Sequence, residues 1–323
     1  MPKVSVVIPV YRVEKYIGRC ARSLFIQTLE DMEFIFVNDC TPDNSIQILL
    51  DVLADFPNRL RQVKIVGHDS NRGLPQARKT GVSNATGDYI AHCDSDDWVD
   101  SKLYEVLYNS VLESNADIAV CDFMVHRYNS LEVRIGTRTN DIEDYKLNLL
   151  FQLNSVSMVN KLIRREIYQN SIEFPTLNMG EDMATTLQLI RFCRTMSFVE
   201  GVCYHYDGTT TSITRKETKR ATLDRAMQAC TNVQLVLNAY KGDYREEVKD
   251  GLTHLKFMQR KQLMPIINHK DVYAIWKRTF PEINRDVIFK KTVKISFYER
   301  LKFFLTLINV FPIVKNLTRK NLD

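Results

Sequence analysis

Short apolar runs alternate with longer amphipathic segments through the first third of the chain. The runs are rich in β-branched residues and recur about every 25–30 residues, the repeat of strand-helix units. Between them, apolar residues at helical spacing predict helices near residues 16–24, 46–53 and 103–111. The sequence therefore predicts an α/β fold, a Rossmann-like and mostly parallel sheet flanked by helices, with strands at Val4–Pro9, Glu33–Asp39, Val63–Val66, Asp88–Asp94 and Asp117–Cys121.

The pattern changes twice further along the chain. A polar stretch over residues 127–144 is followed by helical periodicity at 145–153 and 181–192 and by a strand-like run at 202–206. From Arg215 onward the composition is almost entirely that of helices. We therefore expect one domain over residues 1–212, with parts at 1–121 and 122–212, and a helical region over 213–323.

Charge divides the chain at nearly the same place. Residues 1–210 carry 21 Lys and Arg against 28 Asp and Glu, whereas residues 211–323 carry 23 against 11. An acidic first part argues against nucleic acid as a ligand there, because phosphate backbones are bound by spread lysine and arginine. The basic C-terminal region needs a separate explanation.

Seven cysteines are scattered along the chain, and no Cys-x-x-Cys pair occurs. They predict buried apolar thiols in a reducing compartment, not zinc ligands or disulfides. The chain enters its first strand at Val4 without the charged start, apolar stretch and cleavage site of a secretory leader. We therefore expect a cytoplasmic protein.

Acidic residues gather where the predicted strands end. The second strand ends at Asp39, and the fourth runs into Asp94-Ser-Asp-Asp97. Parallel sheets bind ligands at the carboxyl ends of their strands, and crowded carboxylates favour a bound cation. Carboxylate oxygens suit Mn²⁺ or Mg²⁺, which commonly complete their shells with phosphate oxygens. No P-loop or dinucleotide-binding glycine motif occurs, so the predicted ligand is a metal-bound nucleotide diphosphate.

Six ordered motifs resemble glycosyltransferase family 2 and cover roughly the first two thirds of the chain. The resemblance implies the GT-A fold and inverting, metal-dependent transfer of a sugar from a nucleotide-diphosphate donor, with a uridine nucleotide favoured. One departure is that Asn precedes Asp39, where the family more often has a second Asp. The motifs are Val4-Ser-Val-Val-Ile-Pro-Val-Tyr11, Val37-Asn-Asp39, Asn71-Arg-Gly73 with Ala77-Arg78 and Gly81, Gly87-Asp-Tyr-Ile90, Asp94-Ser-Asp-Asp97 and Gly180-Glu-Asp182.

By this resemblance, residues 1–121 bind the nucleotide sugar. Two residues at the end of the first strand flank the base, Asp39 hydrogen-bonds it, and two residues from the 71–78 segment face the nucleotide. The D-x-D segment supplies Asp96 as the first metal ligand and Asp94 as a contact to the ribose or the metal shell. The implied nucleotide-sugar residues are Pro9, Tyr11, Asp39, Asn71, Arg78, Asp94, Ser95 and Asp96.

The same resemblance makes residues 122–212 the acceptor side. Asp182 would be the general base that takes the proton from the acceptor hydroxyl, and Glu181 would help to position Asp182 or the acceptor. A single displacement needs no covalent intermediate. His205 would be a further metal ligand, and Ser212 or Arg215 a phosphate contact.

Each of these residues also has a purely structural interpretation. Asp39, Asp94 and Asp96 could cap turns, Glu181 and Asp182 could complement a helix dipole, and His205 could be an ordinary strand histidine. Asn71 and Arg78 could lie on a loop and a helix surface, and Pro9 and Tyr11 could simply end a strand and pack.

Two other functions compete with glycosyl transfer. A nucleotidyltransferase of the same fold would carry a glycine-rich, arginine-containing loop after the first strand, where this chain has Pro9-Val-Tyr-Arg12. A non-catalytic nucleotide-binding scaffold would not need both Asp96 and Asp182. The acceptor, a saccharide or a lipid-linked sugar, and the formation of a homo-oligomer are left open.

The C-terminal region holds one further amphipathic pattern. Phe297, Leu301, Phe304, Ile308 and Phe311 share a helical face, with lysines and arginines around them. The stretch is shorter than the ~20 apolar residues that span a bilayer. Either this face lies on an anionic membrane surface, as a peripheral contact, or it packs against protein, including a second copy.

Overall fold

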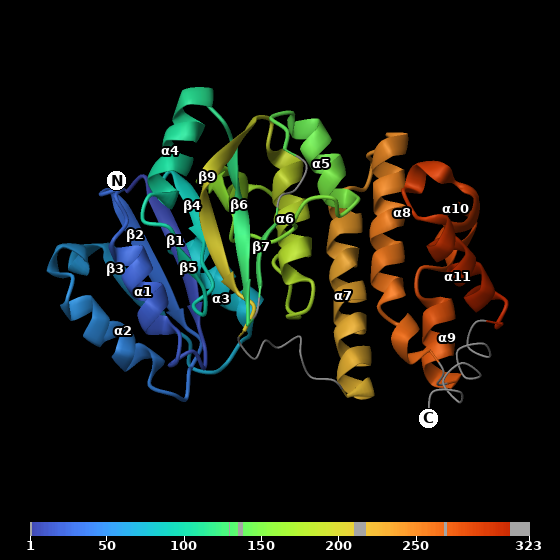
Figure 1. The fold of residues 1–323 in the computed structure, drawn as a ribbon, viewed down its shortest axis with the longest axis horizontal. Coiled ribbons are helices and arrows are strands. Elements are labelled where there is room, and N and C mark those ends of the chain that lie inside the picture. The colour runs from blue at the N-terminus through green and yellow to red at the C-terminus, as the bar shows by residue number, and fades with distance from the viewer. Residues whose placement is uncertain (1, 129, 135–137, 210–217, 268–269, 311–323) are drawn as a thin grey trace. The chain divides into compact units, whose positions relative to one another are not determined.

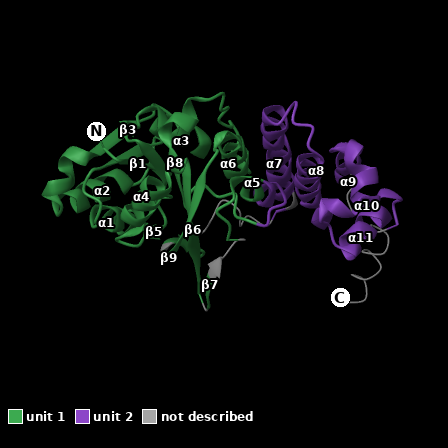
Figure 2. Cartoon of the chain, turned by 90° about the horizontal axis from the view of Figure 1, so that it is seen from above, with its two compact units in different colours: residues 1–146, 154–212 green, residues 147–153, 213–323 purple. Residues whose placement is uncertain are grey.

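The computed structural model describes residues 2–128, 130–134, 138–209, 218–267 and 270–310 (Figure 1). The chain forms two compact units, one of residues 1–146 with 154–212 and one of residues 147–153 with 213–323 (Figure 2). The first is α/β and the second is helical. The short segment 147–153 belongs to the helical unit, which the sequence pattern did not indicate.

The first unit is built on one sheet, which has nine strands in the part of the chain that the structure describes. The strand order is β3-β2-β1-β4-β8-β6-β9-β5, and β7 pairs with β6. The strands are β1 (Val4–Val10), β2 (Met32–Asn38), β3 (Val63–Gly67), β4 (Tyr89–His92), β5 (Trp98–Val99), β6 (Ile118–Arg127), β7 (Ser130–Arg134), β8 (Lys161–Arg164) and β9 (Met196–Asp207).

The sheet is parallel without interruption only in its first half. Strands β3, β2, β1 and β4 pair in parallel, as the repeat predicted. Strand β8 then pairs antiparallel with both β4 and β6, while β6 and β9 are parallel. The mixed sheet therefore confirms the predicted α/β fold and corrects the expectation of a parallel repeat through residue 121.

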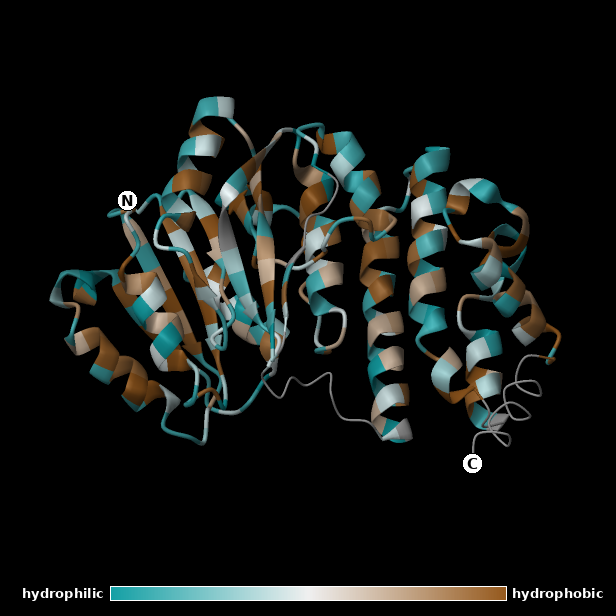
Figure 3. Cartoon of the chain, viewed as in Figure 1, coloured by the Kyte–Doolittle hydropathy of each residue, from teal (hydrophilic) through white to brown (hydrophobic). Residues whose placement is uncertain are grey.

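Helices cover both faces of the sheet. Alternate residues of β1 divide between the faces: Val4, Val6 and Ile8 join the core under α1, α2 and α4, while Val7 joins a smaller core with Ala77 of α3. Figure 3 shows apolar positions along the central strands. The helices of this unit are α1 (Ile17–Phe25), α2 (Ser45–Ala54), α3 (Leu74–Ser83), α4 (Leu103–Ser114), α5 (Ile142–Leu150), which runs into 147–153, and α6 (Glu181–Phe192).

Helix α3 and strands β5, β7 and β8 were not predicted. Helix α3 contains Gly81, where an added Cβ would lie 2.2 Å from a methyl of Val7, so close packing on β1 requires glycine there. Strand β7 alternates polar and apolar residues but lies inside a polar stretch, and β8 begins with Lys161, so neither shows the continuous apolar run of the buried strands.

The cysteine prediction holds for most of the described thiols. Six cysteines are free, and five of these are buried, whereas Cys40 is exposed. The expectation of a buried thiol was therefore wrong for Cys40, which lies in the turn after β2 with φ of 56°. The side chain of Cys203 lies outside the described residues.

The second unit has a core of its own, which includes Phe257, Trp276 and Phe303. In the described residues, no helix is both long enough and apolar enough to cross a membrane. Its helices are α7 (Lys219–Ala239), α8 (Glu246–Lys261), α9 (Lys270–Arg278), α10 (Asn284–Phe289) and α11 (Phe297–Leu307).

Candidate active site

The predicted nucleotide residues lie along one edge of the sheet. Tyr11 follows β1, Asp39 follows β2 and Asp94 follows β4, and β1 lies between β2 and β4. Pro9 is buried within β1 beside Val37, whereas Tyr11 is 38% exposed. Parallel strands bring their carboxyl ends to the same edge, so the fold gathers these residues as expected.

Asp39 organises the loop that precedes α3. One carboxylate oxygen accepts hydrogen bonds from His68 Nδ1 (2.7 Å) and Arg72 N (2.8 Å), and the other from Asn71 Nδ2 (3.0 Å) and Gly73 N (2.8 Å). Four contacts occupy the usual acceptor capacity of a carboxylate. The structure thus shows Asp39 and Asn71 holding a loop, and base recognition by either stays a prediction.

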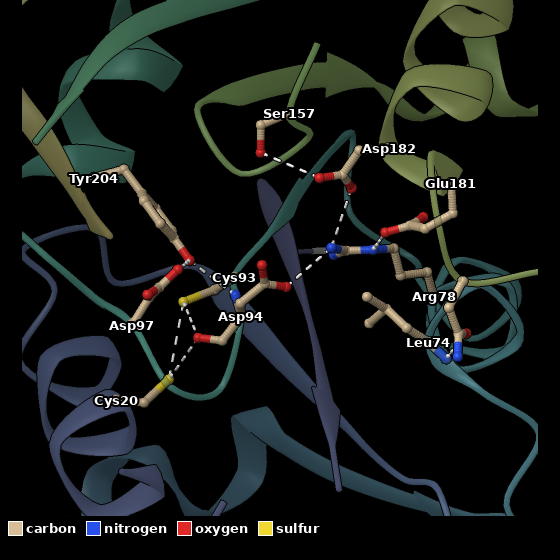
Figure 4. Close-up of polar contacts among 11 residues, drawn as sticks. Cys20, Leu74, Arg78, Cys93, Asp94, Asp97, Ser157, Glu181, Asp182 and Tyr204 are labelled. Atoms are coloured by element: carbon tan, nitrogen blue, oxygen red, sulfur yellow. Dashed lines mark hydrogen bonds and ion pairs between the residues drawn. The ribbon is translucent and has the colours of Figure 1, made fainter. Parts of the chain in front are cut away.

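Arg78 joins the D-x-D segment to the first turn of α6 (Figure 4). Its Nη2 lies 2.9 Å from Asp94 Oδ1 and 3.3 Å from Asp182 Oδ1, and its Nε donates to Glu181 Oε1 at 3.0 Å. The Arg78 side chain is 1% exposed, whereas Asp94 and Asp182 are 27% and 32% exposed. A buried guanidinium therefore holds two partly exposed carboxylates, 88 positions apart in the sequence, at one site.

The charged groups of this cluster shift one another's pKa values. Burial alone would lower the pKa of Arg78, but Asp94, Glu181 and Asp182 raise it well above its usual value. Burial raises the pKa of Glu181 well above that of an ordinary glutamate, and Arg78 only partly opposes this. Burial likewise raises the pKa of Asp94 against the opposing effect of Arg78. The site holds more carboxylates than this one cation compensates.

A buried tyrosine supports the D-x-D turn, a role that the sequence did not indicate. The Tyr204 hydroxyl accepts a hydrogen bond from Asp94 N at 2.9 Å and donates to Asp97 Oδ2 at 2.6 Å. Asp97 is fully buried, and its other oxygen accepts from Asp207 N at 2.8 Å. Asp97 therefore links the D-x-D turn to β9 and has a structural role, unlike the ligand-binding roles predicted for Asp94 and Asp96.

Asp96 and Ser95 complete the segment. Asp96 is half-buried and its carbonyl accepts a hydrogen bond from Arg19 Nη2 at 2.7 Å, while Ser95 is 5% exposed. No three His, Cys, Asp or Glu side chains of the described chain gather into a metal-binding group. The residues present fit an ion held by one or two carboxylates and completed by phosphate oxygens, the pattern of Mg²⁺ at nucleotides.

His205 has protein partners at both ring nitrogens. Its Nε2 lies 2.9 Å from Asp100 Oδ1 and its Nδ1 lies 3.0 Å from His126 Nε2. The ring stacks on Trp98 with a centroid distance of 5.2 Å and an interplanar angle of 4°. Metal ligation by His205 would require one of these contacts to break, and it stays a prediction. Ser212 and Arg215 lie outside the described residues.

The predicted acceptor side contains a buried lysine for which the sequence indicated no role. Lys161, 1% exposed, donates to the carbonyls of Ser155 (2.9 Å) and Ser157 (2.6 Å) and to Asn160 Oδ1 (2.8 Å). The Ser157 hydroxyl in turn lies 3.5 Å from Asp182 Oδ2 (Figure 4). Lys161 thus orders the loop that contacts the predicted base.

The start of α6 is fixed by two glycines. Gly180 has φ of 76° just before Glu181, which a side chain would strain. Gly73 has φ of 84°, and an added Cβ there would lie 2.7 Å from Asn178 Oδ1. The amide of Leu74 donates to the same Asn178 oxygen at 3.2 Å. The start of α3 and the approach to α6 are therefore in direct contact.

The mixed sheet and this carboxylate-arginine site define a GT-A glycosyltransferase. The chain belongs to glycosyltransferase family 2, because the sequence model of that family, "Glycosyl transferase family 2", matches residues 5–171. The predicted family, fold and enzyme class are confirmed.

Individual relatives agree with this assignment. An uncharacterized glycosyltransferase of Bacillus subtilis, EpsJ, is 40% identical over 123 residues, which cover 38% of this chain and 34% of EpsJ. A poly(ribitol-phosphate) beta-glucosyltransferase of Bacillus spizizenii is 30% identical over 63% of this chain and 32% of its own length. The chain therefore matches about a third of each relative.

Solved structures share the fold. S. aureus TarS 1–349 in complex with UDP-GlcNAc superposes with a TM-score of 0.63 and 16% identity over 99% of this chain and 92% of TarS. The mannosyltransferase PcManGT of Pyrobaculum calidifontis, in complex with GDP-Man and Mn²⁺, gives a TM-score of 0.56 and 14% identity over 98% and 87%.

Proposed function

We propose that the chain transfers a sugar, with inversion, from a UDP-sugar to a hydroxyl of a saccharide or lipid-linked acceptor in cell-envelope polysaccharide synthesis. The observation that carries this proposal is the contact of Arg78 with both Asp94 and Asp182. It brings together a nucleotide-side carboxylate and a carboxylate in the first turn of α6. The TarS complex with UDP-GlcNAc and the poly(ribitol-phosphate) relative support the choice of donor and acceptor.

Asp182 would act as the general base. Its side chain is 32% exposed, so it can reach an acceptor hydroxyl, while Arg78 and Ser157 restrict its orientation. The acceptor oxygen attacks the anomeric carbon as its proton moves to Asp182, and the bond from that carbon to the nucleotide diphosphate breaks on the opposite face. Glu181, buried and bound to Arg78, positions the arginine rather than the acceptor.

Asp94 and Asp96 would hold Mn²⁺ or Mg²⁺ together with the diphosphate of the donor. When bound, the ion would neutralise charge on the departing diphosphate. The protein's own residues position the donor: Arg78 and Tyr204 fix the side chain and the amide of Asp94, and Tyr11 would flank the base. A nucleotidyltransferase or a scaffold would not need a base in α6.

The test compares matched carboxylate-to-amide changes. Asp182→Asn should lower sugar transfer by about 10²–10⁴-fold while donor binding is kept, because the general base is lost. Asp51→Asn, an exposed position of α2, should leave transfer unchanged. Transfer by Asp182→Asn within a few-fold of the parent chain would contradict the assignment of the base.

A second measurement identifies the donor and the metal. UDP-, GDP- and TDP-sugars are compared by thermal shift with Mn²⁺, because a ligand at 100 times its Kd adds about 2.7 kcal/mol to the folded state. A UDP-sugar should give the largest shift, and Asp96→Ala should remove its dependence on Mn²⁺. An unchanged Mn²⁺-dependent shift in Asp96→Ala would contradict the metal assignment.

A further inference from the structure

The last described helix of the second unit, α11, packs into its core by one face only. On this inner face Phe303 is 1% exposed and Thr306 is fully buried. The Phe303 ring lies 5.2 Å from the ring of Trp276 and 5.8 Å from that of Phe257. Ser296 caps the helix by accepting a hydrogen bond from Glu299 N. The position of α11 is therefore secured without its other face.

The outer face of α11 carries large apolar side chains that remain exposed. Phe297 is 80% exposed, and Leu301, Phe304 and Ile308 are 43%, 40% and 50% exposed. At 3.6 residues per turn these four positions fall within a stripe about 60° wide. A continuous apolar stripe on a surface marks an interaction site, unlike scattered single residues. We call these four residues the α11 stripe. Phe311, the fifth residue of the predicted face, lies outside the described residues.

The segment that carries the α11 stripe is basic. Residues 285–310 carry six Lys and Arg against two Asp and Glu, and Lys291 and Lys294, just before the helix, are exposed. A second copy of the chain would bring the same positive charge to the interface, which opposes association. An anionic surface is attracted instead.

We infer that the α11 stripe docks on the surface of an anionic phospholipid bilayer, with Lys291 and Lys294 contributing the electrostatic attraction. The geometry fits a helix that lies at the interface between bilayer and water, because its apolar face would be buried in the lipid while basic residues nearby attract the anionic headgroups. This inference rests on the proposed function only for its purpose, which is to bring the enzyme to lipid-linked acceptors.

The test is sedimentation of the full chain with vesicles. Vesicles of phosphatidylcholine with about 30% phosphatidylglycerol are compared with phosphatidylcholine alone, at low and high salt. The stripe variant Phe297→Glu/Phe304→Glu is matched to Leu60→Glu/Leu112→Glu, which makes the same change at side chains 53% and 55% exposed in the first unit. Lys291→Gln/Lys294→Gln tests the charge separately.

The chain should sediment with the anionic vesicles and much less with the neutral ones. The stripe variant should lower the partition coefficient by more than about tenfold, because it removes two phenylalanines that would be buried in the bilayer. The matched variant should bind like the parent, and the lysine variant should lose most of the salt dependence. Melting temperatures close to that of the parent chain establish that the variants are folded.

Three results would overturn the inference: no sedimentation with anionic vesicles, equal binding by the stripe and matched variants, or a dimer in solution that the stripe variant dissociates. The last result would assign the stripe to a second copy. Transfer to a soluble acceptor is measured in parallel. Intact transfer without vesicle binding refutes only the docking, and vesicle binding without transfer refutes only the proposed function.

Discussion

Replacement of Arg78 by methionine tests whether one buried cation holds the site together. Methionine keeps an unbranched chain but removes the charge and the contacts to Asp94, Glu181 and Asp182. Removing one partner of a buried ion pair costs about 3–5 kcal/mol. Domains of this size lose about 2–4 °C in Tm per kcal/mol, so a loss of about 6–20 °C is expected.

The loss should depend on pH in a defined direction. Burial already raises the pKa of Glu181, and without Arg78 this pKa should rise further above its value in the unfolded chain. The folded state then binds a proton that the unfolded state has released, so stability falls as pH rises through this interval. The difference in Tm between Arg78→Met and the parent should therefore be larger at pH 8 than at pH 5.

The assay is thermal unfolding at both pH values in a buffer with a chelator. Arg59→Met is the matched control, because Arg59 is also buried but donates to the carbonyls of Phe25, Gln27 and Leu29, which do not titrate. It should lose stability by nearly the same amount at both pH values. A loss below about 2 °C for Arg78→Met, or a loss equal at both pH values, would refute the reasoning.

Two further variants test the supports of the site. Tyr204→Phe removes the hydroxyl between Asp94 N and Asp97 Oδ2 and should lower the free energy of unfolding in urea by about 1–3 kcal/mol. Tyr128→Phe changes a side chain that is 82% exposed and should leave this free energy unchanged. Equal urea midpoints for the two variants would contradict the expectation. Burial lowers the pKa of Lys161 from 10.5 to about 7, so between these pH values the unfolded chain binds a proton that the folded chain does not. The free energy of unfolding of the parent should therefore rise relative to that of Lys161→Met as pH increases from 7 to 10.5. A difference between the two chains that does not change with pH would contradict this expectation.

The strands that bear the nucleotide residues were predictable because their burial is nearly complete. Every residue of β1 is buried, and its sequence is a continuous apolar run apart from Ser5 and Pro9. Asp39 and Asp94 follow such runs, so their common edge follows from parallel pairing. The reversal at β8 was not predictable, because its four residues include Lys161 and Arg164 and show no clear period.

The contacts by which Arg78 joins the D-x-D segment to α6 could not be predicted from the sequence either. Arg78 was assigned to the nucleotide, but its partners lie 16, 103 and 104 residues away. The signal that could have indicated its burial is Gly81, three residues later, which lets α3 approach β1 closely. A charged residue one turn from such a glycine lies on the side of the helix that faces the sheet. A guanidinium buried there is stable only when carboxylates pair with it.

The charge count of the site limits how a nucleotide diphosphate can bind. The two arginines that contact the described D-x-D segment are both engaged: Arg78 with carboxylates, and Arg19 with Asp96 O and Asp207 at 2.6 Å. A diphosphate would add negative charge where Asp94 and Asp182 already share one guanidinium. Binding that depends on an added divalent cation is therefore the outcome we expect from this geometry, and equal affinity for UDP with and without a chelator would contradict it.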